Sequence, residues 1–60
     1  KNVLITPVPS DYLGKELHEV QLMLVPDKKV VLGINRDNKE ILDTGIILQE
    51  GDQFISIEIL

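Results

Sequence analysis

The shortness of this chain limits what it can fold into. Its 60 residues can form one domain at most, and a domain of that size buries only about 60% of the surface that its unfolded chain exposes. Small domains usually need a disulfide, a metal or a partner for stability. The chain has no cysteine, which excludes disulfides and thiolate metal sites, and a single histidine cannot build a zinc site unaided. Zero cysteine also fits a reducing compartment such as the cytoplasm.

The side chains are unusually aliphatic. Val, Ile and Leu supply 23 of the 60 residues and alanine is absent, which favours strands over helices. This is more aliphatic surface than a small domain can easily hide, and the surplus indicates a protein–protein interface. The net charge is −4 and the six basic residues do not cluster, so nucleic acid is not an expected partner. No apolar run approaches the roughly 18 residues of a membrane span, so we expect no direct membrane insertion.

The pattern of apolar residues predicts the helix and the first strand. Residues 2–8 are mostly apolar and rich in β-branched side chains, and Pro7 and Pro9 stop the segment, so we expect an edge strand or a strand that ends at Thr6. From residue 13 the period changes to that of a helix, predicted over 13–22. Pro26 forbids its continuation, so a turn is expected there. The chain starts at Lys1 with residues that already favour a strand, and we interpret residues 1–60 as a single domain from a longer protein.

Three or four further strands are predicted after the helix. They cover 29–36, 39–42, the short apolar run 46–48, and 54–60. Asp37 and Asn38 are expected to form a two-residue turn, and Gly51 is expected to have positive φ. The resulting fold class is α+β, two-layer, with a four- to five-stranded, mostly antiparallel sheet and one short helix in the order β-α-β-β-(β)-β. The residues predicted to form the core are Leu13, Leu17, Val20, Val30, Leu32, Ile34, Ile55 and Ile57.

Three segments together resemble the C-terminal subdomain of RCK proteins, also called the TrkA-C domain. Residues 14–20 are GKELHEV, similar to the family's helix start G-K-x-L-x-E-L. Residues 31–39 are VLGINRDNK, similar to an apolar strand that runs into R-[DN]-G-K. Residues 48–55 are LQEGDQFI, similar to L-x-x-G-D-x-L-[IV]. The sequence departs from the family pattern at Asn38, where a glycine is usual, and around residues 42–44, where a proline is common.

The resemblance implies a cytoplasmic regulatory module of a potassium channel or transporter, and not an enzyme. In that family the subdomain follows a Rossmann-like N-terminal subdomain and pairs with a copy of itself. Some members bind cyclic di-AMP at the dimer interface, and others respond to divalent cations. Two other classes remain open: a structural β-rich appendage of an unrelated enzyme, and a peptide-binding module with an open sheet edge.

The resemblance brings Asn35 and Arg36 near the position of the cyclic di-AMP site. Arg36 could bind a phosphate, because a guanidinium matches phosphate geometry. Alternatively, it is a solvated arginine at a strand end that pairs with Asp37 or Glu40. No cofactor is expected apart from this dinucleotide, which the resemblance alone suggests. For the homodimer, the aliphatic residues that the chain's own core does not obviously need are Val3, Ile5, Ile46 and Ile47.

The remaining polar residues favour no catalytic or metal site. The carboxylates near the strand ends fit no calcium loop, and we expect them to be solvated. They are Asp37, Glu40, Asp43, Glu50 and Asp52. His18 is expected on the exposed side of the helix, although a histidine can also sense pH. Ser10 and Ser56 have no base or third partner that would make either of them a nucleophile.

Overall fold

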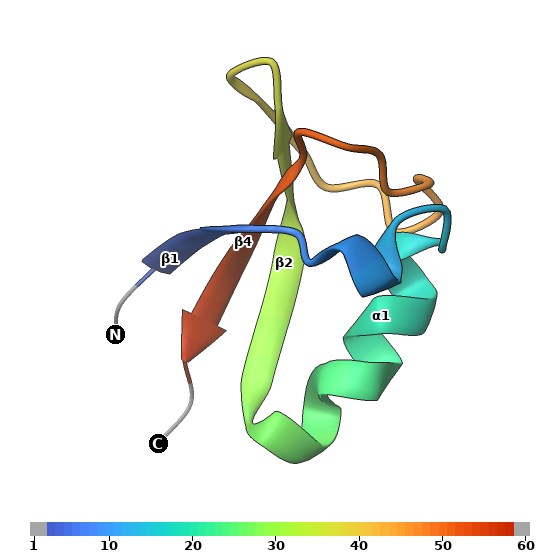
Figure 1. Cartoon of the computed structure of the whole chain (residues 1–60). Coiled ribbons are helices and arrows are strands. Elements are labelled where there is room, and N and C mark those ends of the chain that lie inside the picture. Colours follow the sequence, from blue (N-terminus) through green and yellow to red (C-terminus); the bar gives the residue numbers. More distant parts are fainter. Residues whose placement is uncertain (1–2, 59–60) are drawn as a thin grey trace.

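Four antiparallel strands form one sheet in the computed structural model, which describes residues 3–58 (Figure 1). The spatial order is β1-β4-β2-β3. The bounds are Val3–Pro7 for β1, Lys29–Arg36 for β2, Lys39–Ile41 for β3 and Gln53–Glu58 for β4. The predicted α+β class and the position of β1 at a sheet edge are confirmed. The optional fifth strand at 46–48 does not form, because Ile47 makes only an isolated bridge with Glu16.

The helix α1 spans Leu17–Leu24, four residues later at its start than predicted. The backbone of the preceding residues is already paired elsewhere. Gly14 N–H donates to the Leu48 carbonyl at 2.9 Å, and Leu48 N–H donates to the Lys15 carbonyl at 2.9 Å. Glu16 is extended, and its N–H is bonded to the Glu19 carboxylate at 3.3 Å. The loop 42–52 therefore fixes where α1 begins.

α1 ends at Leu24, two residues later than predicted, and it stops before Pro26 as expected. A 3₁₀ turn, Val25–Asp27, continues from the helix and carries Pro26 in its first turn. Lys28 then adopts a left-handed conformation with φ 59° and leads into β2. A second 3₁₀ turn, Ser10–Tyr12, lies between β1 and α1. Within residues 3–58 no helix has the length and apolarity needed to cross a bilayer.

The core lies between α1 and one face of the sheet. Its buried members come from α1, β2, β4 and the loop before β4, and they are Leu17, Val20, Val31, Ile34, Leu48 and Phe54. Leu17, Val20, Ile34 and Ile55 are buried as predicted, and Leu13 and Ile57 are half-buried. The prediction of a core position is wrong for Val30 and Leu32, which are 40% and 41% exposed.

A β-bulge in β2 explains this error. Val31 lies opposite Ser56, whereas Gly33 lies opposite Ile55, so the register shifts between Val31 and Gly33. The extra residue changes the alternation, and Val31 and Ile34 both reach the side that packs on α1. The prediction assumed an uninterrupted strand with Leu32 on the face of Ile34.

The face of β4 that packs against α1 is the opposite of the predicted one. Phe54 belongs to the core beside α1, and Ser56, two residues later, shares its side and is buried. Ile55 and Ile57 therefore point to the opposite face of the sheet. Residues 59 and 60, which the prediction included in this strand, lie outside the described residues.

Both predicted turns are confirmed. Asp37 and Asn38 have φ of 54° and 63°, as the two central positions of a tight hairpin between β2 and β3 require. Gly51 has φ of 92° in the turn before β4. An L-residue with a side chain rarely adopts this conformation, which accounts for the glycine.

Candidate functional site

Arg36 and Asp52 form a two-pronged ion pair at one end of the sheet. Arg36 is the last residue of β2, and Asp52 immediately precedes β4. Arg36 Nε donates to Asp52 Oδ1 at 2.8 Å, and Nη2 donates to Oδ2 at 2.7 Å. The Asp52 side chain is 1% exposed and that of Arg36 is 24% exposed. This parallel geometry is among the stronger hydrogen-bonding arrangements that proteins form.

The same two side chains also hold the loop that precedes β4. Asp52 Oδ2 accepts the Gln49 N–H at 2.8 Å, and Arg36 Nη2 donates to the Ile47 carbonyl at 2.9 Å. Hydrogen bonding to Arg36 lowers the pKa of Asp52, although burial acts in the opposite direction. The same bond raises the pKa of Arg36. The pair is therefore fully ionised at neutral pH and connects the loop to β2.

This geometry changes the interpretation of the predicted ligand residues. The alternative prediction, in which Arg36 pairs with Asp37 or Glu40, is wrong. The carboxylate partner of Arg36 is Asp52. Asn35 donates from its side-chain amide to Gln53 Oε1 at 3.3 Å. Within the described residues, Nη1 is the part of the guanidinium that makes no hydrogen bond. A phosphate would have to bind there or replace Asp52.

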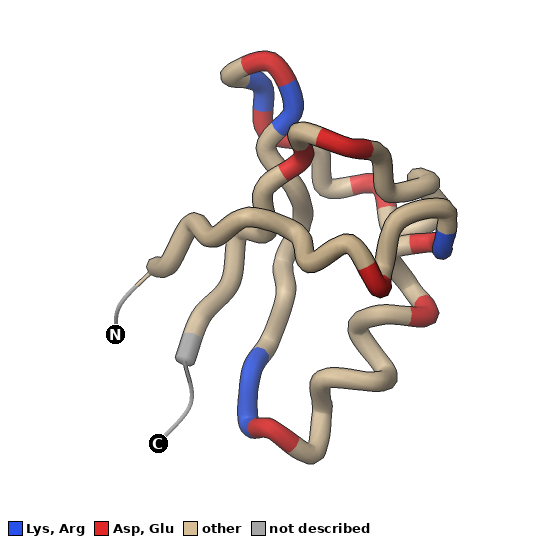
Figure 2. Tube along the Cα trace, viewed as in Figure 1, with Lys and Arg blue, Asp and Glu red and all other residues tan. Residues whose placement is uncertain are grey.

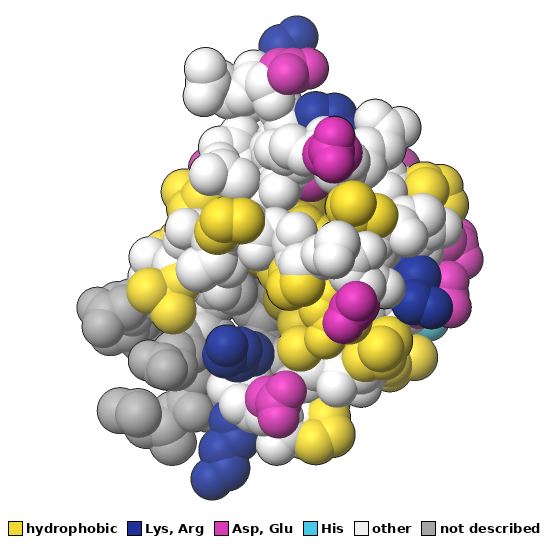
Figure 3. Space-filling view, viewed as in Figure 1, with side chains coloured by type: hydrophobic (Ala, Val, Ile, Leu, Met, Phe, Trp, Pro, Cys, Tyr) yellow, Lys and Arg dark blue, Asp and Glu magenta, His cyan; other side chains and the backbone are white. Residues whose placement is uncertain are grey.

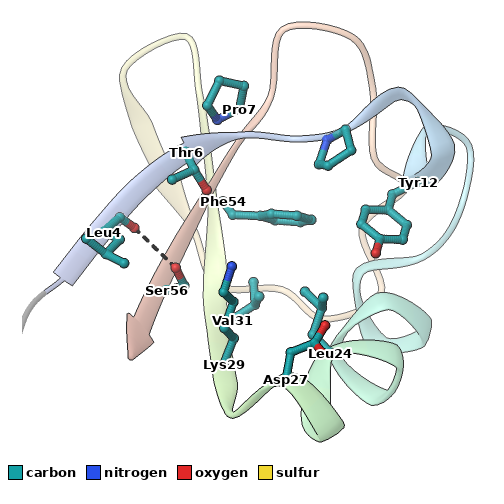
Figure 4. Close-up of a pocket in the computed structure, with 11 residues that line it drawn as sticks. Leu4, Thr6, Pro7, Tyr12, Leu24, Asp27, Lys29, Val31, Phe54 and Ser56 are labelled. Atoms are coloured by element: carbon teal, nitrogen blue, oxygen red, sulfur yellow. Dashed lines mark hydrogen bonds between the residues drawn. The ribbon is translucent and has the colours of Figure 1, made fainter. Parts of the chain in front are cut away.

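A pocket of about 400 Å³ lies between β1, β4, β2 and the end of α1 (Figure 4). The Phe54 ring crosses it between Thr6 and Val31, and the Tyr12 ring lies 6.1 Å from that of Phe54, centre to centre. The lining is mostly apolar, and the space-filling view shows apolar side chains gathered between the strands and the helix, with charged side chains around them (Figure 3). Lys29 and Asp27 supply the charged groups of the lining. The pocket suits an apolar group with few polar atoms.

The other candidate residues do not converge. Within residues 3–58 there is no group of three or more side chains that could hold a metal ion. Among the five acidic residues, only Asp52 is buried, and it is bonded to Arg36. His18 is exposed on α1, as expected. The Ser56 hydroxyl donates to the Leu4 carbonyl at 3.5 Å and has no histidine or carboxylate among its hydrogen-bond partners in the described residues.

The four residues predicted for a dimer interface lie in two places. Val3 and Ile5 are 61% and 53% exposed on β1. Ile47 is 45% exposed and bridges to Glu16, in the loop that lies beside the start of α1 (Figure 1). Ile46 is half-buried and packs against the chain's own core. The structure therefore does not bring the four together into one patch.

A larger apolar surface, which sequence reasoning missed, lies on the side of the sheet away from α1. Residues paired across antiparallel strands share a face, and Val3 and Val30 both pair with Ile57, while Ile5 pairs with Ile55. Leu42 joins them, because its side chain lies over Gly33, the partner of Ile55. We call this surface the open face, and its members are Val3, Ile5, Val30, Leu42, Ile55 and Ile57. The signal for it was the apolar residues on both faces of the predicted strands.

Several members of the open face are strongly exposed. The exposed fractions are 61% for Val3, 40% for Val30 and 65% for Leu42. Within residues 3–58 the α-helix packs over the other face of the sheet and not over this one. Scattered apolar residues are common on protein surfaces, but a contiguous apolar sheet face usually marks a contact with another chain or domain.

Comparison of the chain with known protein families, with curated proteins and with solved structures finds no match. The likeness to TrkA-C domains therefore rests on the three sequence segments described above.

Proposed function

We propose that this chain is a self-associating regulatory domain, similar to the TrkA-C part of a potassium channel or transporter. Its role is to pair with a second copy and to pass a change in the pairing to a gate elsewhere in the protein. The observation that carries this proposal is the open face, because residues 3–58 leave an apolar sheet surface that α1 does not cover. The three TrkA-C-like segments add the link to potassium transport.

The mechanism follows from the size of the domain. A small domain with few internal contacts gains much of its stability from association, so a ligand that favours one arrangement of the pair shifts the population between arrangements. The two-pronged bond between Arg36 and Asp52 keeps each copy internally rigid at the sheet end. The motion would then occur between copies rather than within one.

Sedimentation analysis of the isolated chain tests the association directly. We expect a species of twice the 6.8 kDa chain mass, with the proportion rising from low to hundreds of micromolar concentration. Leu42→Asp places a charge on the open face away from β1, so it should weaken a dimer that buries the open face and should leave unchanged a dimer that pairs only through the edge strand β1. Glu40→Asp alters an exposed residue of the hairpin and serves as the control. A clean monomer at the highest concentration would contradict the proposal.

The ligand part of the proposal has its own test. Calorimetry with cyclic di-AMP on the dimeric protein measures whether the Asn35–Arg36 region binds the dinucleotide. Heat that disappears when Arg36 is replaced by lysine would support a phosphate contact, since lysine keeps the charge but not the planar fork. No heat at high micromolar dinucleotide would remove this ligand and leave self-association unaffected.

A further inference from the structure

The outer edge of β1 has less protection than sheet edges usually have, because its one protective residue is Pro7 at the end of the strand. Within the described residues β1 has a hydrogen-bonded neighbour on one side only, β4, and all five of its residues are exposed. It carries no charge (Figure 2). The opposite edge, β3, has only three residues and includes Lys39 and Glu40. Short, charged edges resist pairing with other chains, whereas apolar uncharged edges favour it.

The backbone groups that this edge offers follow from one hydrogen bond. Val8 N–H donates to the Asp52 carbonyl at 3.2 Å, so the backbone groups of Val8 point toward β4. Along a strand these groups alternate in direction, so those of Thr6 and Leu4 also point toward β4. The N–H and C=O groups of Val3 and Ile5 therefore point away from the sheet, together with the carbonyl of Pro7, which has no N–H.

We propose that β1 pairs with β1 of a second copy, antiparallel and with the twofold axis at Ile5, to give one eight-stranded sheet. This inference rests on the proposed self-association and specifies where it occurs. Ile5 N–H of each copy donates to the Ile5 carbonyl of the other. Val3 N–H donates to the carbonyl of the partner's Pro7, which needs no N–H to take part. All the outward-pointing donors of β1 are used.

The side chains of β1 suit this arrangement on both faces. Ile5 lies beside the partner's Ile5 on the open face, where the two 53% exposed side chains cover each other. On the helix side, Leu4 lies beside the partner's Thr6, next to the mouth of the pocket that both residues line. The absence of charge on β1 means that two copies, each of net charge −4, meet where neither carries a charge.

A second copy also suits the edge better than other occupants do. A donor and acceptor pattern that alternates about Ile5 is complementary to itself under a twofold axis, which is the commonest symmetry of dimers. A specific interface should bury at least about 1,000 Å² in total, or about 500 Å² per copy. The area per copy is roughly an eighth of the 4286 Å² that one copy exposes. The exposed residues of β1, with their neighbours on both faces of the sheet, would supply this area.

Single cysteines test the register without interference, because the chain has none of its own. In the proposed dimer, Ile5→Cys places two Cα atoms about 5.5 Å apart, within the range that a disulfide spans. Val3→Cys is the matched control, since Val3 lies opposite the partner's Pro7, about 13 Å along the strand from the partner's Val3. We expect Ile5→Cys to form a covalent dimer on mild oxidation and Val3→Cys to form little.

A backbone substitution gives an independent readout. Ile5→Pro removes an N–H that the chain's own sheet does not use, and proline is tolerated on edge strands. Circular dichroism should show an unchanged fold, and the dimer dissociation constant should rise at least tenfold relative to Ile5→Val. If Ile5→Pro does not fold, the two cysteine variants decide.

The outcomes separate the two proposals. A wild-type dimer in which Ile5→Cys does not cross-link, or in which folded Ile5→Pro still dimerises normally, overturns pairing at β1 and leaves self-association through the open face. A wild-type chain that stays monomeric at hundreds of micromolar overturns both.

Discussion

Replacement of Asp52 by asparagine should strongly destabilise the domain. The carboxylate accepts two hydrogen bonds from Arg36 and one from the Gln49 N–H, and its side chain is 1% exposed. The asparagine amide keeps the shape of the carboxylate, but its NH₂ group would face one of the N–H donors that Asp52 now binds. Removing one partner of a buried pair costs about 3–5 kcal/mol, and a hydrogen bond to a charged group contributes about 1.5–3 kcal/mol. Because Arg36 is 24% exposed and can be rehydrated, we expect a loss of about 2–4 kcal/mol.

Urea denaturation at neutral pH measures this loss. A domain of this length has a total stability of roughly 3–9 kcal/mol, so the variant should unfold at a much lower urea concentration. Asp37→Asn is the matched control, because it makes the same chemical change beside Arg36 in an exposed turn, at φ 54° where asparagine is well tolerated. We expect Asp37→Asn to change stability by less than about 0.5 kcal/mol. If the two variants behaved alike, the structural role assigned to Asp52 would be wrong.

The pH dependence provides a second check on the same pair. The pKa of Asp52 is lowered below its ordinary value of 3.8 in the folded protein, chiefly by hydrogen bonding to Arg36. The stabilisation from this group is therefore fully present above that value, and it is lost as the pH falls below it through the folded pKa. The stability difference between wild type and Asp52→Asn should be large at pH 7 and should shrink as the pH falls below about 3.8. A difference that stayed constant would show that Asp52 does not act through its charge.

Two further predictions concern packing. Leu17→Ala, at a fully buried position, should cost about 2–5 kcal/mol in urea denaturation, whereas Leu22→Ala, 63% exposed on the same helix, should cost less than about 0.5 kcal/mol. Gly33→Ala would place a Cβ 2.5 Å from the Ile41 carbonyl oxygen, so thermal melting should show a loss of about 1–3 kcal/mol. Gly45→Ala, with its nearest atom at 3.4 Å, should melt close to wild type.

The local features of the fold were well predicted because each depends on a few neighbouring residues. The prolines predicted that β1 lies at a sheet edge, and Asp37 and Asn38 predicted the hairpin turn. Gly51 predicted the second turn in the same way. The start of α1 was missed because it depends on the Leu48 backbone, which lies far along the sequence and pairs with residues 14 and 15. No local pattern reports such a contact.

The face of the sheet that packs on α1 could not be predicted for a different reason. Alternation shows which residues share a face, but both faces of β2 are aliphatic, so hydrophobicity does not tell them apart. In β4 the more aliphatic face, with Ile55 and Ile57, is the one turned away from α1. The bulge at Leu32 then breaks the alternation itself. The partner of Arg36 was missed for the reason that applied to α1: Asp52 is 16 residues away, and only the pairing of β2 with β4 brings it close.

The edge of β1 and the open face are surfaces of different orientation, and this has a consequence for the proposed function. Pairing at β1 extends the sheet sideways, so it leaves most of the open face accessible, including Val30 and Leu42 at 40% and 65% exposure. A regulatory domain needs two contacts, one to the second copy and one to the part of the protein that it controls. If the edge provides the first, the open face is available for the second. A change at the twofold axis would then reorient both open faces together, because each belongs to the same continuous sheet.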